Sequence, residues 1–487
     1  MVRNQADEPD IQHRNLIDGR WVDADSGDRF EVRDPATDEI IARVPDCGRA
    51  ETGRAIAAAA RALDAWRALP AFERSGMLRT TADMMLRDQD RLAHLMTREQ
   101  GKPLAEARAE VAYAASFIEW AAEEAKRVYG ETVPASSADK RILVLRRPIG
   151  VTACITPWNF PIAMITRKLG PALAAGNTMI VKPAEETPLS ALAFGELAVS
   201  AGIPAGVVNI VTGDPVDIGE ELLANPVVRK LSFTGSTETG KVLIRKSAQN
   251  VTRLSLELGG HAPFLVFDDA DLDAAVAGAL ASKYRNMGQT CICANRFYVQ
   301  DGVYDAFADK LSAAVARMRI GRGTDDGVEI GPLIDDAAME KVERHVADAV
   351  ARGARVRRGG ERVRVDGLAD RFYAPTVIDD FTPEMLLNCE ETFGPVAPLR
   401  RFSTDADAIA MANESVYGLA AYFYTRDASR LMRVAEALEC GIVGANDGKP
   451  STAQAPFGGI KQSGYGREGG RYVMDEYTEI KYVSWQL

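Results

Sequence analysis

The chain has 487 residues, a formal net charge of -11 and a hydrophobic content of 46%. At roughly 100–200 residues per domain this length predicts two to four domains. An acidic chain without a basic stripe is a poor candidate for binding nucleic acid or an anionic membrane surface. No apolar run reaches the ~18 residues that a membrane span needs.

The N-terminal stretch MVRNQADEPDIQHRN is polar and lacks the apolar segment of a secretory signal. The six cysteines are scattered without the spacing of a disulfide framework, apart from one close pair. Together these features predict a cytoplasmic protein whose thiols stay reduced.

The first third of the chain has helical patterns. Apolar residues recur three and four positions apart in 51–69, in 74–101 and in 102–130. Gly101 is the expected end of the second helix, since glycine commonly terminates helices.

Short apolar strands then alternate with helices. Strands are expected at 141–157, 177–183, 206–213 and 229–236, and helices at 190–202 and 219–226. This alternation predicts βαβ units and a parallel sheet. The region near 150–255 is therefore expected to be an open nucleotide-type domain, joined to the helices before it.

The alternation resumes after Gly259 and predicts a second α/β domain over about 256–445. Strands are expected at 262–270 and 373–380, and helices at 303–321 and within 337–360. The C-terminal EIKYVSW, residues 479–485, alternates in polarity and suits an exposed strand that pairs outside its own domain.

The cysteine pair lies in NMGQTCICANR, residues 286–296, as Cys291 and Cys293. Zinc usually takes four ligands, and none of the four histidines lies in ligand spacing with a cysteine, so no metal site is predicted. A disulfide, two inert buried thiols and a nucleophile remain possible readings. The surrounding glycine and polar residues favour a reactive thiol near backbone donors.

Two further stretches offer partners for a nucleophilic thiol. In LSLELGGH, Glu257 follows an apolar strand and precedes two glycines, and a partly desolvated glutamate can act as a general base on water. His261 is a competing base. In ITPWNFP, Asn159 lies between two aromatic residues, either as part of a rigid turn or as an amide donor aimed at an oxyanion.

Phosphate-binding features lie at strand ends. FTGSTETG, residues 233–240, follows a strand and opens a helix, where glycines and hydroxyls suit a phosphate. It lacks the GxGxxG dinucleotide pattern. Lys182 ends a strand, where ligands bind in open α/β sheets.

Several motifs together resemble the NAD(P)-dependent aldehyde dehydrogenase superfamily: TPWNFP, VKPAEETP, FTGSTETG, LELGG, GQTC, EETFGPV and PFGGIKQSG. The stretches MITRKLGPALAAGNT, KYRNMGQTCICANR and YGLAAYFY are most similar to succinate-semialdehyde dehydrogenases. The resemblance implies an α/β, aldehyde dehydrogenase-like fold with three parts. These are a Rossmann-like cofactor-binding domain at 1–127 and 150–256, a catalytic α/β domain at 257–445, and a small β oligomerisation element at 128–149 and 470–487.

The resemblance also implies catalytic roles. Cys291 matches the nucleophile that forms a thiohemiacetal and then a thioester, and Asn159 with the Cys291 backbone N–H would hold the oxyanion. Glu257 matches the general base that activates water for thioester hydrolysis. Glu468 matches a residue that assists proton relay in some members.

The cofactor implied is NAD, with NADP less favoured. Residues matching the lining of the dinucleotide site are Trp158, Lys182, Ser236, Glu391 and Phe393. Glu185 is informative because a carboxylate there accepts from both adenosine ribose hydroxyls but repels a 2′-phosphate.

The substrate implied is an aldehyde with a distal anionic group, with succinate semialdehyde the leading expectation. Arg167 and Arg285 match two arginines that clamp the distal carboxylate, and Ser451 matches a serine that assists them. Lys449 and Pro450 stand where relatives carry apolar residues. An added cation keeps glutarate semialdehyde, a keto-acid semialdehyde and a sulfonated aldehyde open.

Relatives are dimers or tetramers, so a homo-oligomer is expected, with the C-terminal strand pairing across subunits. A different class, a cysteine hydrolase or acyltransferase that needs no NAD, remains an alternative. Some relatives with two cysteines spaced like Cys291 and Cys293 are redox-controlled, which makes a reversible disulfide between them a hypothesis for this chain.

Overall fold

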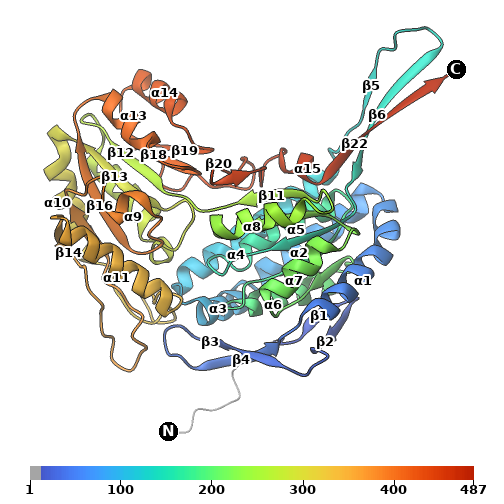
Figure 1. Cartoon of the computed structure of the whole chain (residues 1–487), viewed down its shortest axis with the longest axis horizontal. Helices are drawn as coiled ribbons and strands as arrows, with labels where there is room; N and C mark the ends of the chain where they lie inside the picture. Colours follow the sequence, from blue (N-terminus) through green and yellow to red (C-terminus); the bar gives the residue numbers. More distant parts are fainter. Residues whose placement is uncertain (1–11) are drawn as a thin grey trace.

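The computed structural model describes residues 12–487 of the chain. The predicted polar lead lies mostly outside that range, at residues 1–11. Two open sheets organise two lobes, and a smaller three-stranded sheet projects away from both (Figure 1). The expected mixed α/β architecture is therefore confirmed.

The first open sheet has eight strands in the order β2-β1-β9-β8-β7-β10-β11-β21. Their bounds are β1 Asn15–Ile17, β2 Arg20–Val22, β7 Val151–Ile155, β8 Thr178–Lys182, β9 Val208–Ile210, β10 Val228–Thr234, β11 Arg253–Glu257 and β21 Gly464–Tyr465. The five strands β9, β8, β7, β10 and β11 run parallel, as predicted. They are largely buried, because helices cover both faces of the sheet.

Eight helices surround this sheet. They are α1 Arg49–Ala68, α2 Ala71–Arg87, α3 Gln89–Gln100, α4 Leu104–Ala125, α5 Ala163–Ala174, α6 Pro188–Ser200, α7 Pro215–Ala224 and α8 Thr237–Ser247. One apolar core lies among α2 to α6, and a second lies between the sheet and α1, α7 and α8. The sequence predicted one helix over 74–101, but Asp88 leaves the helical conformation and separates α2 from α3. Gly101 ends α3 with a φ of 92°, as predicted.

The second open sheet has seven strands in the order β14-β15-β16-β13-β12-β18-β19. Their bounds are β12 Ala262–Val266, β13 Ala294–Gln300, β14 Arg355–Arg358, β15 Thr376–Asp379, β16 Val396–Phe402, β18 Ala420–Tyr424 and β19 Ile442–Ala445. All neighbours pair in parallel except β14 and β15. Its helical elements are α9 Leu272–Lys283, η2 Arg285–Gly288, η3 Asp301–Val303, α10 Tyr304–Val315, α11 Asp336–Ala351, α12 Leu386–Cys389, α13 Asp405–Asn413 and α14 Ala428–Ala437.

The projecting sheet joins segments far apart in the sequence. It consists of β5 Glu131–Val133, β6 Lys140–Pro148 and the C-terminal β22 Thr478–Gln486, all antiparallel, with the short α15 Val473–Glu476 before β22. Large apolar side chains on β22 are exposed, among them Ile480 at 70%, Tyr482 at 61% and Trp485 at 58%. Two short pairs complete the strands, β3 Arg29–Arg33 with β4 Ile40–Pro45, and β17 Tyr417–Gly418 with β20 Ile460–Lys461.

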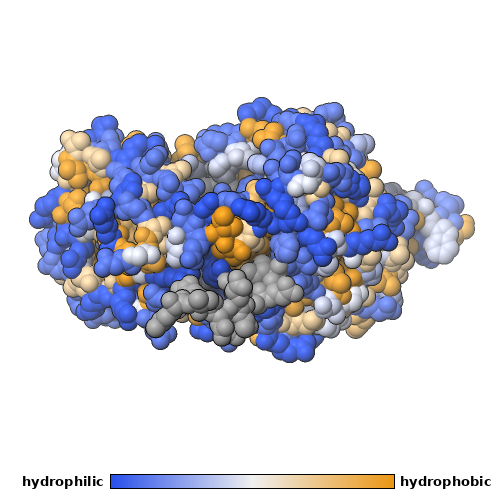
Figure 2. All heavy atoms as spheres, turned by 90° about the horizontal axis from the view of Figure 1, so that it is seen from below, coloured by the Kyte–Doolittle hydropathy of each residue, from blue (hydrophilic) through white to orange (hydrophobic). Residues whose placement is uncertain are grey.

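The face seen in Figure 2 is mostly hydrophilic, with apolar residues scattered in small groups. Scattered apolar residues are usual on protein surfaces. Within residues 12–487, no helix has the length and apolar character needed to cross a bilayer.

Candidate active site

Cys291 lies in the loop between η2 and β13, in an unusual stretch of backbone. Three consecutive residues before it have left-handed φ values: Asn286 at 51°, Met287 at 55° and Gly288 at 76°. This conformation is costly for residues other than glycine, so surrounding contacts must hold it. The Asn286 N–H donates to a carboxylate oxygen of Glu106 at 2.8 Å, which ties the loop to the first turn of α4.

Two cavities reach Cys291. One, of about 480 Å³, is lined by Ala105, Glu106, Ala109, Glu110, Tyr113, Phe160, Met164, Arg167, Arg285, Thr290, Cys291, Ile292, Lys449, Ser451 and Phe457. The other, of about 370 Å³, is lined by Pro157, Trp158, Asn159, Thr234, Gly235, Ser236, Leu258, Gly259, Cys291, Ile334, Asp335, Ala337, Ala338, Lys341, Glu391, Thr392 and Phe393. Cys291 is the one residue common to both sets. The thiol can therefore be approached from both cavities, here named the α4 cavity and the α8 cavity after the helices beside them.

Three cationic side chains line the α4 cavity, and their surroundings differ. Arg167 is buried, forms an ion pair with Glu468 at 2.7 Å and stacks on the Phe457 ring at 3.7 Å. Arg285 and Lys449, in contrast, have no carboxylate within ion-pair distance among the described residues. The buried Nε of Arg285 has no hydrogen-bond partner there either. The guanidinium of Arg285 faces the ring of Phe160, 5.3 Å from its centroid.

The predicted clamp is therefore only partly pre-formed. No local sequence pattern predicts the internal partner of Arg167, because Glu468 lies in a distant segment of the chain. The Ser451 hydroxyl lines the same cavity and hydrogen-bonds the Tyr113 hydroxyl from α4. Arg285 and Lys449 are therefore the cations of this cavity that can bind the anionic group of a ligand.

The α8 cavity contains four of the six predicted cofactor residues. Trp158 and Phe393 pack edge to face, with ring centroids 5.6 Å apart, and form part of its wall. The Ser236 hydroxyl caps α8 by accepting from the Thr239 N–H at 3.1 Å. Glu391 accepts from the Gly260 N–H at 3.0 Å, and burial raises its pKa to about 7.

The features of this cavity fit a dinucleotide. Gly235 and Ser236 line this cavity at the N-terminus of α8, and a helix N-terminus suits a phosphate. The other two predicted cofactor residues, Lys182 and Glu185, form an ion pair at the end of β8 and do not line the cavity. The side chain of Glu185 is 37% exposed, whereas that of Lys182 is 3% exposed.

The thiol and the candidate base are both buried and influence each other. Burial raises the pKa of Cys291 well above its ordinary value, and the negative charge of Glu257 raises it further. Glu257 ends β11, is 3% exposed, and neither carboxylate oxygen has a hydrogen-bond partner among the described residues. Burial raises the pKa of Glu257 to about 8, while Arg167 lowers it. A carboxylate in such a setting is a suitable proton acceptor at neutral to mildly alkaline pH.

Asn159 lies in the turn between β7 and α5 and is 3% exposed. Its side-chain nitrogen donates to the Gln289 carbonyl at 2.9 Å, two residues before Cys291. Since an amide nitrogen carries two hydrogens, this bond fixes the side chain and leaves one N–H for another acceptor. The structure thus brings the predicted oxyanion donor beside the loop that carries Cys291.

Glu468 is buried between two cations. It pairs with Arg167 and with Lys168, and the Lys168 ammonium also donates to the Thr234 hydroxyl at 2.6 Å. Burial favours the neutral acid, but Lys168 and Arg167 outweigh it and hold the pKa of Glu468 below its ordinary value. Glu468 in turn raises the pKa of Glu257, so the two carboxylates belong to one electrostatic cluster.

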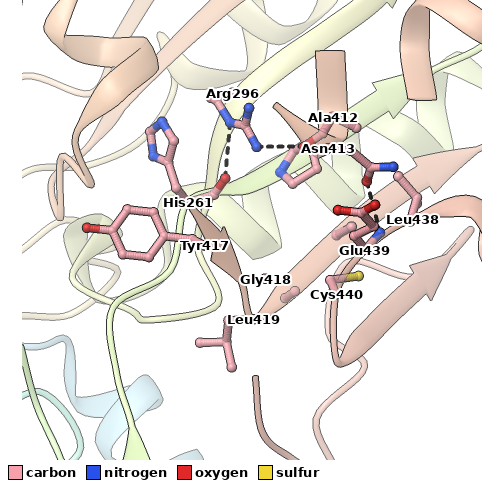
Figure 3. A pocket seen from close by; sticks show the side chains of 13 residues that line it. His261, Arg296, Ala412, Asn413, Tyr417, Gly418, Leu419, Leu438, Glu439 and Cys440 are labelled. Atoms are coloured by element: carbon pink, nitrogen blue, oxygen red, sulfur yellow. Dashed lines mark hydrogen bonds between the residues drawn. The ribbon is translucent and has the colours of Figure 1, made fainter. Parts of the chain in front are cut away.

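His261 occupies a different place from the thiol. It lines a small pocket with Arg296, Tyr417 and Cys440 (Figure 3), and this pocket does not include Cys291. Its Nε2 donates to the Asn388 carbonyl at 3.0 Å, and burial with the nearby Arg296 lowers its pKa well below the ordinary value. The surroundings of His261 therefore give no support to a Cys-His pairing.

Cys293 is fully buried and faces a lysine. The Lys283 ammonium donates to the Cys293 sulfur at 3.3 Å and to the Asn295 side chain at 2.8 Å. All six cysteines are free. Among residues 12–487, no group of three or more His, Cys, Asp or Glu side chains is arranged to hold a metal.

Sequence reasoning missed several residues around the thiol. Glu106, Glu110 and Tyr113 line the α4 cavity from one face of α4. Their spacing of four and three places them on one helix face, a signal that was present in the sequence. Lys341, which lines the α8 cavity from α11, lies in a surface-like helical pattern that carried no such signal.

Comparisons with known proteins identify the family of the chain. Residues 21–483 match the sequence profile of the aldehyde dehydrogenase family. The chain is 61% identical over 473 residues to the glutarate-semialdehyde dehydrogenase of Pseudomonas aeruginosa, covering 97% of each chain. It is 60% identical to the succinate-semialdehyde dehydrogenase [NADP(+)] of Escherichia coli, covering 97% of this chain and 98% of that protein. The crystal structure of succinate-semialdehyde dehydrogenase from Burkholderia pseudomallei superposes with a TM-score of 0.97 at 56% identity, covering 99% of this chain and 100% of the other.

Proposed function

The chain belongs to the aldehyde dehydrogenase family, and on that premise we propose that it oxidises an aldehyde with a distal anionic group, with NAD as its preferred cofactor. One observation carries the substrate class: the α4 cavity holds two cations, Arg285 and Lys449, that form no ion pair in the described chain, although both attract the Glu106 carboxylate that lines the same cavity. The half-buried Arg285, whose buried Nε has no hydrogen-bond partner in the described chain, would gain from a carboxylate or sulfonate that reaches it.

The chemistry follows from the groups around the thiol. Cys291 adds to the aldehyde carbon from the α4 cavity, and its proton passes to a base. The free N–H of Asn159 and the Cys291 backbone N–H stabilise the oxyanion of the thiohemiacetal, where a preorganised donor contributes roughly 2.7–4 kcal/mol. Oxidation to the thioester needs a hydride acceptor, which NAD supplies when it is bound in the α8 cavity.

Glu257 completes the cycle. Its carboxylate takes a proton from water, the resulting hydroxide attacks the thioester carbon, and the acid leaves while the Cys291 thiol is regenerated. Glu468 assists by its charge and its ion pairs, which tune the pKa of Glu257. In this assignment Cys291, Glu257 and Asn159 are catalytic, and Glu468 supports the base.

The cofactor is held by Trp158, Ser236, Glu391 and Phe393, which line the α8 cavity. Glu185 argues for NAD over NADP because its exposed carboxylate repels a 2′-phosphate. The ammonium of Lys182, which would otherwise attract that phosphate, is already paired with Glu185. One relative carries NADP(+) in its name, so the cofactor ratio is a direct test of this reasoning.

Succinate semialdehyde is the proposed substrate, with glutarate semialdehyde as the second candidate. Relatives of similar identity are named for each. Lys449 favours the second, because a cation near the cavity entrance also suits an anion on a longer chain. Arg285, Ser451 and, once released from Glu468, Arg167 would contact the anionic group.

The test follows NADH formation at saturating NAD with succinate semialdehyde, glutarate semialdehyde and butanal, for the wild type and for Cys291→Ala. We expect the anionic aldehydes to have the higher kcat/KM and Cys291→Ala to be inactive. A preference for butanal would refute the substrate class. Release of acid from a thioester or ester with no aldehyde oxidation would favour the NAD-independent hydrolase instead.

We also propose a domain assignment for the chain. Residues 1–127 and 150–256 form the cofactor-binding domain and 257–445 the catalytic domain. The projecting sheet, within 128–149 and 470–487, serves oligomerisation. The exposed apolar side chains of β22 support the last assignment, since a partner subunit would bury them.

A further inference from the structure

A buried ion pair lies beside the active site without lining the α8 cavity. Lys102, in the turn before α4, and Glu110, on α4, are 2.5 Å apart from Nζ to Oε2, and both side chains are 1% exposed. Lys102 lines neither cavity, and Glu110 reaches only the α4 cavity. Neither residue has a role in the chemistry proposed above.

The contacts of the pair converge on the segment that carries Asn159. The Lys102 ammonium donates to the Asn159 backbone carbonyl at 2.7 Å. The other carboxylate oxygen of Glu110 accepts from the N–H groups of Ile162 and Ala163 at 3.1 and 3.2 Å, at the N-terminus of α5. The ion pair therefore fastens the turn from residue 159 to residue 163 at both ends.

The same carbonyl also links this turn to the nucleophile loop. The Asn286 side chain donates to the Asn159 carbonyl at 2.9 Å, while the Asn159 side chain donates to the Gln289 carbonyl at 2.9 Å. Lys102 also lies 4.1 Å from the centroid of the Phe160 ring. A displacement of Lys102 would thus move Asn159 relative to Cys291.

Energetics favour a geometric role over a stabilising one. Desolvation makes a buried ion pair little better than an apolar pair of the same volume, so it is weak evidence for stability. An ion pair can fix the geometry around it, because each charged group forms several directional hydrogen bonds at once. The hydrogen bonds of Lys102 and Glu110 go to backbone groups around Asn159.

We propose that Lys102 and Glu110 are positioning residues that hold the Asn159 side chain in register with Cys291. The proposal rests on the proposed function only in assigning Asn159 to the oxyanion. It predicts that loss of Lys102 acts through Asn159 and slows acylation of the thiol, with substrate binding nearly unchanged.

The test is a double-mutant cycle of Lys102→Met and Asn159→Ala. The burst of NADH formation measures aldehyde oxidation. The burst of 4-nitrophenolate from 4-nitrophenyl acetate measures attack by the thiol without any oxidation, so the cycle can be read even if the aldehyde assignment fails. We expect Lys102→Met to lower both burst rates about 10–100-fold, the scale of a ~1 Å misplacement, with KM changed less than about threefold. In the Asn159→Ala background, Lys102→Met should lower the two burst rates by less than about threefold.

Lys230→Met is the matched control. Lys230 is also a fully buried lysine paired with a carboxylate, Glu476, but its contacts lie away from Asn159. The Lys230→Met substitution should lower thermal stability while leaving both burst rates unchanged. If Lys102→Met folds poorly, Glu110→Gln replaces it, because glutamine keeps the acceptor for Ile162 and Ala163 but loses the charge that orients Lys102. The proposal would be overturned if Lys102→Met lowered the burst rates by the same factor in the wild-type and the Asn159→Ala backgrounds. It would also be overturned if Lys102→Met and Glu110→Gln both left the burst rates unchanged.

Discussion

The ionisation of Glu257 leads to a quantitative expectation for the pH dependence of turnover. With a pKa of about 8, about one tenth of the carboxyl groups are ionised at pH 7 and about nine tenths at pH 9. A general base works only in its ionised form, so kcat should rise about tenfold between these pH values when thioester hydrolysis limits turnover. The thiol of Cys291 cannot produce this rise by its own ionisation, because its pKa is raised far beyond this range.

Steady-state rates of NADH formation at saturating NAD and saturating aldehyde, measured from pH 6 to 9.5, check this expectation. Glu257→Gln should lower kcat by about 10²–10⁴ and remove the rise. Glu468→Gln should move the midpoint to lower pH, because it removes a negative charge that raises the pKa of Glu257 and leaves Arg167 free to lower it. A flat wild-type profile, or a rise that survives in Glu257→Gln, would show that another group is the base.

Four further expectations concern the substrate, the cofactor, the second cysteine and assembly. Arg285→Met should lower kcat/KM for succinate semialdehyde about 10–150-fold, the ~1.5–3 kcal/mol of a charged hydrogen bond, and equal losses with butanal would contradict the clamp. Glu185→Ser should raise the NADP-to-NAD ratio of kcat/KM up to about fivefold, ~1 kcal/mol for an exposed charge pair; an unchanged ratio argues against its role. After peroxide, a reductant should restore the wild type but not Cys293→Ala if a disulfide protects Cys291, and equal recovery excludes that switch. Trp485→Asp should shift the molar mass in light scattering toward smaller species, and an unchanged mass would exclude β22 from the interface.

The sequence was informative wherever a site residue follows a strand within a few positions. Glu257 ends β11 and Lys182 ends β8, so strand patterns alone placed them at the edge of a sheet where ligands bind. Cys291 and Asn159 stood out because glycine, proline and polar residues interrupt apolar patterns around them. Family resemblance supplied the chemical roles that these patterns left open.

Long-range pairing was beyond sequence reasoning. Arg167 was expected to be free for substrate, yet its ion-pair partner Glu468 comes from a distant segment that only the folded chain brings near. Lys102 and Asn159 are 57 residues apart, and nothing local distinguishes that lysine from a surface one. The break at Asp88 between α2 and α3 has no clear sequence signal either, since an apolar periodicity can continue across a single residue outside the helical conformation.

The meeting of the two cavities at a single residue has a consequence for engineering. Residues that line the α4 cavity and residues that line the α8 cavity form separate sets apart from Cys291. Substitutions at distant sites with no shared partners usually combine additively. Away from the Lys102–Glu110 pair, which links the α4 cavity to Asn159, aldehyde range and cofactor choice can therefore be redesigned independently, with variants optimised in parallel and then merged. A molecule built to fill both cavities, in contrast, must pass the sulfur of Cys291, which makes an electrophile at its midpoint a selective covalent inhibitor design.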